Sequence, residues 1–213
     1  MSITQNKVVV AGGGLMGTGI AHAFASSGFV TVLVDSNEAA AAKALSAVAK
    51  ILDDGVRLGK LDAAVAEAAK SRLTTQADLA AASAGAALLV ETVTENIAVK
   101  KQVVATAAAH MLPDAIIATN TSALSVTEIA TAVPQPERVV GMHFFNPVHK
   151  MKLVELVRGI ATSDETVART REYSDALGKT SIIVNESPGL TTSRMSAMLG
   201  NEAMWMLQEG VAT

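Results

Sequence analysis

The stretch Val8-Val9-Val10-Ala11-Gly12-Gly13-Gly14-Leu15-Met16-Gly17 joins a short run of β-branched residues to four glycines. Such an apolar run is typical of a strand that is buried on both faces. The glycines fit the spacing G-x-G-x-x-G, which marks a tight turn between a strand and a helix. Free N–H groups and the helix dipole favour negative charge at a helix N-terminus. The stretch therefore predicts a phosphate-binding turn in an α/β fold, although glycines in such a turn can also serve packing alone.

Short apolar runs alternate with segments of helical composition along most of the chain. We expect mostly buried strands at residues 8–11, 30–34, 87–93, 115–119, 139–145, 152–157 and 181–184. We expect helices at residues 15–27, 39–58, 62–70 and 98–111. The alternation predicts a Rossmann-type α/β fold, in which a doubly wound, mostly parallel sheet is covered by helices on both faces.

The composition narrows the class of protein. Of the 213 residues, 50% are hydrophobic and 17% are charged, which predicts a sizeable core. The net charge of −3 argues against nucleic acid or an anionic membrane as the main partner. The chain has no cysteine, so disulfides and thiolate ligands are excluded and we expect no metal site. The polar N-terminus leaves no room for a signal peptide, and we expect a cytoplasmic location.

The residue Asp35 ends the second expected strand, 18 residues after Gly17. A carboxylate at this place can accept hydrogen bonds from the adenosine ribose and would repel a 2′-phosphate. The next residues, Ser36, Asn37 and Glu38, supply no cation to neutralise such a phosphate. The pattern therefore favours NAD over NADP as the cofactor. The alternative is that Asp35 caps the helix that follows.

A histidine and a glutamate interrupt two of the later apolar runs. His143 lies within Gly141-Met142-His143-Phe144-Phe145, and Glu155 lies within Leu153-Val154-Glu155-Leu156-Val157. A carboxylate buried without a partner is strongly destabilising. We therefore expect Glu155 to pair with the imidazole of His143, an arrangement that orients the ring and increases its basicity. The pair would be either a general base for an alcohol proton or a structural bond between two strands.

Six short motifs follow one another in a fixed order along the chain. They are Gly12-Gly13-Gly14-Leu15-Met16-Gly17, Val93-Thr94-Glu95-Asn96, Asn120-Thr121-Ser122, His143-Phe144-Phe145-Asn146-Pro147-Val148, Met151-Lys152-Leu153-Val154-Glu155 and Ser187-Pro188-Gly189. Together they resemble the L-3-hydroxyacyl-CoA dehydrogenase family, and within it the bacterial enzymes that act on 3-hydroxybutyryl-CoA. The resemblance covers essentially the whole chain, and the ordered set is far more specific than the glycine turn alone.

The resemblance implies an NAD-dependent interconversion of (S)-3-hydroxyacyl-CoA and 3-oxoacyl-CoA, in fatty-acid or butanoate metabolism. It implies that His143 is the catalytic base, that Glu155 orients it and that Ser122 contacts the substrate near the nicotinamide ribose. The implied NAD contacts are Gly12, Gly14, Leu15, Met16, Gly17, Asp35, Glu95, Lys100, Ser122 and Asn146.

Two features depart from the family pattern. Ser193 stands where the family usually has an asparagine that helps to bind the acyl thioester or keto oxygen. The lysines that contact the CoA phosphates in relatives are not matched one for one. Lys50, Arg57 and Lys60 are the nearby cations that could bind an acyl-CoA substrate in their place.

The end of the chain changes character. Ser187-Pro188-Gly189 is a turn signal with Ser187 as a candidate cap, and an apolar, methionine-rich helix is expected over residues 190–208. That helix has too many apolar residues for a solitary surface helix. We expect an NAD-binding domain at 1–186 and the first helix of an all-α C-terminal domain at 187–213, the rest of that domain being absent. The resemblance implies a homodimer through this helix.

Two other functions stay open from the sequence. A related dehydrogenase could use the same histidine and glutamate on a hydroxy acid or sugar acid, and it would need no site for CoA phosphates. Alternatively, the chain could be an NAD-binding module with little or no catalysis, because most of the C-terminal domain is missing. Turnover of acetoacetyl-CoA separates these functions.

Overall fold

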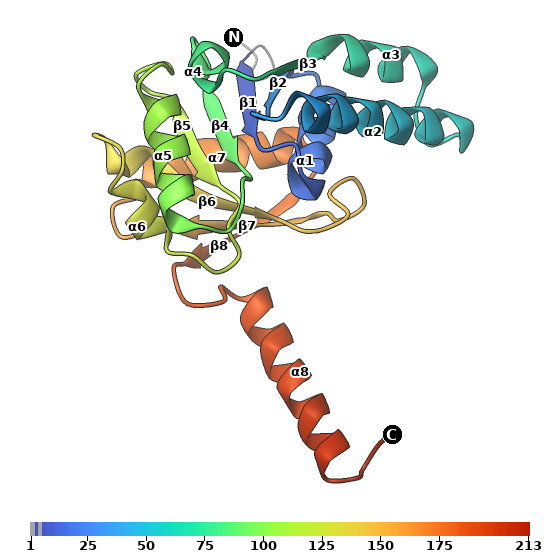
Figure 1. The fold of residues 1–213 in the computed structure, drawn as a ribbon, viewed down its shortest axis with the longest axis vertical. Coiled ribbons are helices and arrows are strands. Elements are labelled where there is room, and N and C mark those ends of the chain that lie inside the picture. The colour runs from blue at the N-terminus through green and yellow to red at the C-terminus, as the bar shows by residue number, and fades with distance from the viewer. Residues whose placement is uncertain (1–2, 4–5) are drawn as a thin grey trace.

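The computed structural model describes Ile3 and residues 6–213. Eight strands form one sheet in the order β3-β2-β1-β4-β5-β6-β7-β8 (Figure 1). The strands are β1 Lys7–Ala11, β2 Val30–Val34, β3 Leu73–Gln76, β4 Leu88–Glu91, β5 Ile116–Thr119, β6 Val139–Phe144, β7 Leu153–Arg158 and β8 Thr180–Asn185. All neighbours pair in parallel except β6 and β7, which run antiparallel. The order of the first six strands is that of a Rossmann-type fold, so the predicted fold class is confirmed.

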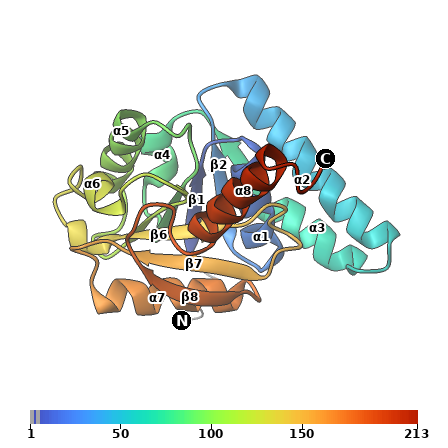
Figure 2. The same ribbon diagram turned by 90° about the horizontal axis from the view of Figure 1, so that it is seen from below.

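Helices cover both faces of the sheet. They are α1 Leu15–Ser26, α2 Glu38–Arg57, α3 Ala63–Arg72, α4 Leu79–Ser83, α5 Ile97–Ala108, α6 Val126–Ala130, α7 Asp164–Ala176 and α8 Thr192–Gln208, with a short 3₁₀ helix at Pro136–Arg138. Successive side chains of a strand point to opposite faces. Val8 and Val10 therefore pack under α1, α2, α3 and α7, whereas Val9 and Ala11 pack under α4, α5 and α6. Figure 2 shows α5 and α7 on opposite sides of the sheet.

Several elements were not expected from the sequence patterns. The strand β3 has the sequence Leu-Thr-Thr-Gln, which contains no apolar run. The helix α7 is largely polar, with only five buried residues among 13, so its apolar stripe is weak. The helices α4 and α6 have five residues each, too few for a helical period to be seen.

The helix expected from residue 190 begins two residues later. Leu190 has a φ of 51°, a left-handed conformation that cannot continue a right-handed helix. The N-cap of α8 is Thr191, and its side chain makes no capping hydrogen bond. Ser187, the expected cap, instead begins the turn before the helix, where its carbonyl accepts from the N–H of Leu190.

The reversal of β7 brings together groups that are distant in the sequence. The strands β1, β4, β5 and β6 all end at one edge of the sheet, and β7 begins there. His143 near the end of β6 therefore lies directly opposite Glu155 near the start of β7. Open α/β sheets bind ligands outside the carboxyl ends of their strands, where the strand order reverses. Here the reversal lies between β1 and β4.

The helix α8 projects away from the sheet (Figure 1) and contains no buried residue. Its large apolar side chains are exposed, namely Met195, Met198, Leu199, Met204, Trp205, Met206 and Leu207. An apolar surface of this kind is typical of a protein contact. None of the helices in the described part of the chain has both the length and the hydropathy needed to cross a lipid bilayer.

Candidate functional site

The glycine turn leaves room for a ligand at the N-terminus of α1. Gly12 has a φ of +109°, and a Cβ at Gly17 would lie 1.8 Å from the carbonyl oxygen of Gly12. Both positions therefore require glycine. At Gly14, the N-cap, a Cβ would meet nothing within 4 Å, and no side chain caps the helix. The N–H groups in the first turn of a helix have no acceptor within the helix, so they can bind a phosphate.

Asp35 lies beside this turn, just after β2. Its Oδ2 accepts a hydrogen bond from the N–H of Gly13 at 2.8 Å, and its Oδ1 accepts one from Asn37 at 2.9 Å. The cap of α2 is Asn37 and not Asp35. Asp35 and the glycine turn line a cavity of about 410 Å³, which has an apolar wall formed by Val34, Leu79, Val93, Val99 and Val103. A carboxylate beside an apolar slot suits a nucleoside, whose ribose is polar and whose base is flat and apolar on its faces.

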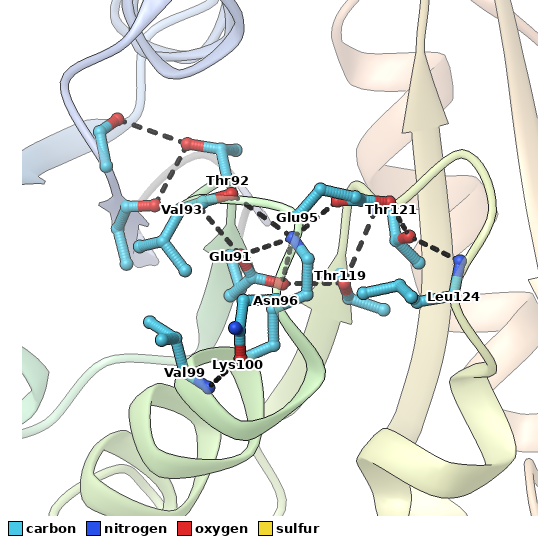
Figure 3. Close-up of polar contacts among 12 residues, drawn as sticks. Glu91, Thr92, Val93, Glu95, Asn96, Val99, Lys100, Thr119, Thr121 and Leu124 are labelled. Carbon is cyan, nitrogen blue, oxygen red and sulfur yellow. Dashed lines mark hydrogen bonds and ion pairs between the residues drawn. The ribbon is translucent and has the colours of Figure 1, made fainter.

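A buried ion pair lies behind the loop that follows β4 (Figure 3). Nζ of Lys100 lies 2.9 and 3.1 Å from the two carboxylate oxygens of Glu91, and both side chains are at most 1% exposed. The same carboxylate accepts hydrogen bonds from the N–H of Val93 and the hydroxyl of Thr119, each at 2.7 Å. Two buried charges are tolerated only where such bonds replace their lost hydration. The pair thus ties α5 and the β4 loop to β5.

The ammonium of Lys100 also reaches a second carboxylate, that of Glu95. The distance from Nζ to Oε2 of Glu95 is 3.2 Å, and the Glu95 side chain is 44% exposed. The hydroxyl of Thr121 donates to the other oxygen of Glu95. Burial favours the neutral form of this carboxyl, but the bond from Thr121 and the charge of Lys100 together lower the pKa of Glu95 below its usual range. An ionised, partly exposed carboxylate therefore stands at the ligand edge of the sheet.

His143 and Glu155 face each other across β6 and β7. Nδ1 of His143 lies 2.7 Å from Oε2 of Glu155, which is fully buried, while the His143 side chain is 8% exposed. Because a carboxylate has no proton to give, Nδ1–H is the donor. The ring of Phe145 packs against the imidazole with 4.7 Å between centroids. None of the described residues forms a hydrogen bond with Nε2, so this nitrogen is left for a ligand.

The loops at this edge hold the other predicted polar residues. Ser122 and Asn146 are exposed, after β5 and β6 respectively, and Ser193 is half-buried in the first turn of α8. The side chain of Asn120 joins the two strand ends, since its Oδ1 accepts from the N–H of Phe144 at 2.9 Å. The roles of Ser122, Asn146 and Ser193 stay predictions.

A second cavity, of about 670 Å³, is lined by α1, α2 and the loop after β6. The three cations predicted to bind the substrate, Lys50, Arg57 and Lys60, all line it, together with His22, His149 and Lys150. Burial is the main reason that the pKa of His22 falls to about 4, and His149 and Lys179 add to this effect. The rings of His22 and His149 lie 5.9 Å apart. Asp54 also lines the cavity and forms an ion pair with Arg57 at 2.9 Å, so Lys50, Lys60 and Lys150 give the cavity its excess of positive charge, which suits a polyanionic group.

Sequence reasoning missed part of the site, namely Glu91, Thr119 and the side-chain role of Thr121. Glu91 carried a usable signal, because it is a carboxylate within the apolar run Leu88-Leu89-Val90-Glu91, just as Glu155 interrupts β7. The two threonines carried no comparable signal, since their partners become neighbours only through the sheet.

Comparison with known proteins gives a consistent set of relatives. A family model described as "3-hydroxyacyl-CoA dehydrogenase, NAD binding domain" matches residues 7–187. The Bacillus subtilis (strain 168) protein named "Probable 3-hydroxybutyryl-CoA dehydrogenase" is 38% identical over 206 residues, which are 97% of this chain and 71% of that protein.

Solved structures agree with this match. The crystal structure of M. tuberculosis FadB2 superposes with a TM-score of 0.94 at 34% identity, covering 100% of this chain and 74% of that chain. The (S)-3-hydroxybutyryl-CoA dehydrogenase PaaH1 from Ralstonia eutropha superposes with a TM-score of 0.93 at 38% identity, covering 98% of this chain and 74% of that chain.

Replacing Glu91 with glutamine tests the buried ion pair. We expect Glu91→Gln to lower the free energy of unfolding by about 3 kcal/mol, because the buried ammonium of Lys100 loses its nearest counter-charge. Glu128→Gln is the matched control, since it breaks the 3.1 Å pair of the next lysine, Lys101, which is partly exposed and contributes less than about 1 kcal/mol. Urea unfolding at neutral pH measures both, and equal losses would contradict the assignment.

The lowered pKa of His22 predicts a loss of stability in mild acid. In the unfolded chain this histidine takes up a proton near pH 6.5, whereas in the fold it does so only near pH 4. The unfolded state therefore binds more protons in this window, and stability falls as the pH falls through it. The variant His22→Gln cannot titrate and should show a shallower fall. Denaturant unfolding across this pH range measures the difference, and identical slopes would rule out the effect.

Proposed function

The chain belongs to the 3-hydroxyacyl-CoA dehydrogenase family of NAD-dependent oxidoreductases, and we propose that it interconverts (S)-3-hydroxybutyryl-CoA and acetoacetyl-CoA. The observation that carries the proposal is the buried pair of His143 and Glu155, at the same edge of the sheet as the glycine turn. The names of the similar proteins support a short acyl chain. The reaction belongs to fatty-acid or butanoate metabolism.

In the proposed reaction His143 is the general base for the 3-hydroxyl group. Glu155 accepts a hydrogen bond from Nδ1–H of His143, so the proton of the neutral ring is on Nδ1 and the lone pair is on Nε2. During alcohol oxidation Nε2 takes the hydroxyl proton. The positive charge that forms on the ring is stabilised by the adjacent carboxylate. In the reverse direction Nε2–H donates its proton to the 3-keto oxygen.

The glycine turn fits the pyrophosphate of NAD, because Gly12 and Gly17 admit no Cβ while Gly14 faces open space. We assign this group to the turn Gly12, Gly14, Leu15, Met16 and Gly17, and the adenosine ribose to Asp35. When bound, NAD supplies the hydride acceptor.

The other residues assigned to NAD are Glu95, Lys100, Ser122 and Asn146. Lys100 is 1% exposed and lies between Glu91 and Glu95. Its part is therefore to hold the Glu95 carboxylate in place for the cofactor.

The acyl group and the CoA phosphates of the substrate are assigned to two different places. Ser122 would contact the reacting end of the acyl group, and Ser193 would donate a hydrogen bond to its thioester or keto oxygen. The cavity that contains Lys50, Arg57 and Lys60 would bind the CoA phosphates, because its cations outnumber its one carboxylate, that of Asp54, and attract a polyanion. A homodimer through α8, a cytoplasmic location and a domain boundary between residues 186 and 187 complete the proposal.

The assay that tests the proposal compares acetoacetyl-CoA with free acetoacetate as the oxidant of NADH. We expect kcat/KM to be higher for acetoacetyl-CoA by about tenfold or more, because only the CoA ester can use the cationic cavity. Similar values would favour the related dehydrogenase that acts on a free hydroxy acid or sugar acid. Binding of NADH without its consumption by either substrate would favour a nucleotide-binding module.

Replacing His143 with glutamine tests the general base. We expect His143→Gln to lower kcat by about 10²- to 10⁴-fold while the affinity for NADH stays nearly unchanged. His110→Gln, at an exposed histidine just after α5, is the matched control and should keep full activity. NADH fluorescence titration and steady-state kinetics measure the two quantities. Retained turnover in His143→Gln would overturn the assignment.

A further inference from the structure

The carboxylate of Glu155 has more donors than His143 alone. Its Oε2 accepts from Nδ1 of His143 at 2.7 Å and also from the hydroxyl of Thr192 at 3.2 Å. Its Oε1 accepts from the backbone N–H of Thr192 at 3.1 Å. Thr192 is the first residue of α8. One residue of the projecting helix therefore binds both oxygens of the carboxylate that faces His143.

These two bonds are the polar attachment of α8 to the sheet. Within the described residues, no other hydrogen bond or ion pair joins α8 to a strand. The helix itself has no buried residue. The chain just before it is anchored differently, by Leu190 in the core and by the carboxylate of Glu186, which accepts from the N–H of Thr127 at 3.0 Å. The start of α8 is thus held in place by Glu155.

We propose that Thr192 is a positioning residue for the pair of His143 and Glu155, and that through it α8 sets the proton affinity of the base. The inference rests on the proposed role of His143 as general base. It goes further in linking that base to the helix after the sheet domain, so that a movement of α8 away from β7 would change the chemistry of the pair.

The sign of the effect follows from charge. When His143 is neutral, the negative charge of Glu155 is balanced only by its hydrogen bonds, and the hydroxyl of Thr192 contributes strongly. When the ring is protonated, it balances the carboxylate itself, and the hydroxyl contributes less. The hydroxyl therefore favours the unprotonated pair, which is the form that accepts a proton from an alcohol. Removing it should make the pair easier to protonate.

No other charged group contacts the pair among the described residues. The neighbour of Glu155 on β8 is Ile182, and the ring that packs on His143 is that of Phe145. On the β5 side, Asn120 binds the backbone next to His143 through its amide oxygen. From α8 only Thr192 reaches the carboxylate. The hydroxyl of Thr192 is thus an uncharged donor in direct contact with the pair, and we expect its removal to change the proton affinity of the pair.

Three variants test the proposal on the whole chain. Thr192→Val keeps the shape and the backbone N–H but removes the hydroxyl donor, and Thr192→Ser restores that donor. Thr191→Val is the matched control, because the neighbouring threonine makes no capping hydrogen bond. The first readout is the pH dependence of kcat for oxidation of 3-hydroxybutyryl-CoA. The second is the NMR titration midpoint of the His143 ring, identified by its absence in His143→Gln, which needs no turnover.

We expect Thr192→Val to shift both the acidic limb of the rate profile and the NMR midpoint to higher pH by roughly half a unit. Thr192→Ser and Thr191→Val should match the unmodified chain. An unchanged midpoint in Thr192→Val, or an equal shift in Thr191→Val, would overturn the proposal. A shift in the NMR midpoint of a chain that turns over no CoA substrate would sustain the coupling and reject only the proposed function.

Discussion

Glu155 is a carboxylate without solvent exposure in the middle of a strand, and the arrangement around it follows from the cost of that burial. An ionised group in such a place must find donors that replace water. A parallel continuation of the sheet would have carried β7 in the opposite direction and its start away from this edge. The antiparallel pairing of β6 and β7 instead sets the imidazole of His143 opposite the carboxylate. The N–H and the hydroxyl of Thr192 donate to the same carboxylate. The first residue of α8 therefore supplies the other hydrogen bonds of Glu155.

The same constraint operates on the other side of the site. Glu91 ends β4 with no exposure, and its oxygens are met by Lys100, Val93 and Thr119. The two buried carboxylates thus lie at the same edge of the sheet, Glu91 at the end of β4 and Glu155 near the start of β7. One holds the loops predicted to bind the cofactor, and the other holds the imidazole predicted to take the proton. Each joins a loop or a helix end to a strand through hydrogen bonds, and such bonds hold the side chains of a site in place.

Local sequence signals predicted the parts of the fold and site that depend on neighbouring residues. The glycine turn, Asp35 after the second strand and the lone charges in apolar runs all carry their meaning within a few residues. Other features depend on the tertiary structure. Lys100 was expected to contact NAD, but its partnership with Glu91 became visible only through the fold.

The secondary-structure elements that were wrongly predicted also depend on tertiary contacts. The strand β3 was missed because Leu-Thr-Thr-Gln is held by its pairing with β2 and not by apolar patterning. The start of α8 was placed too early because nothing in the sequence shows that Leu190 turns into the core with a positive φ. The grouping of His22 and His149 with the three predicted cations likewise required the packing of α1 against the loop after β6.

In the proposed reaction, Nε2 of His143 meets the reacting oxygen of a 3-oxoacyl thioester while Glu155 holds the other ring nitrogen. A crystal structure of the chain with oxidised NAD and acetoacetyl-CoA, a pair that cannot react with each other, measures this directly. We expect the 3-keto oxygen within about 3 Å of Nε2, with the contact between Nδ1 and Glu155 retained. A keto oxygen bound elsewhere, with Nε2 facing solvent or protein, would show that His143 is not the general base.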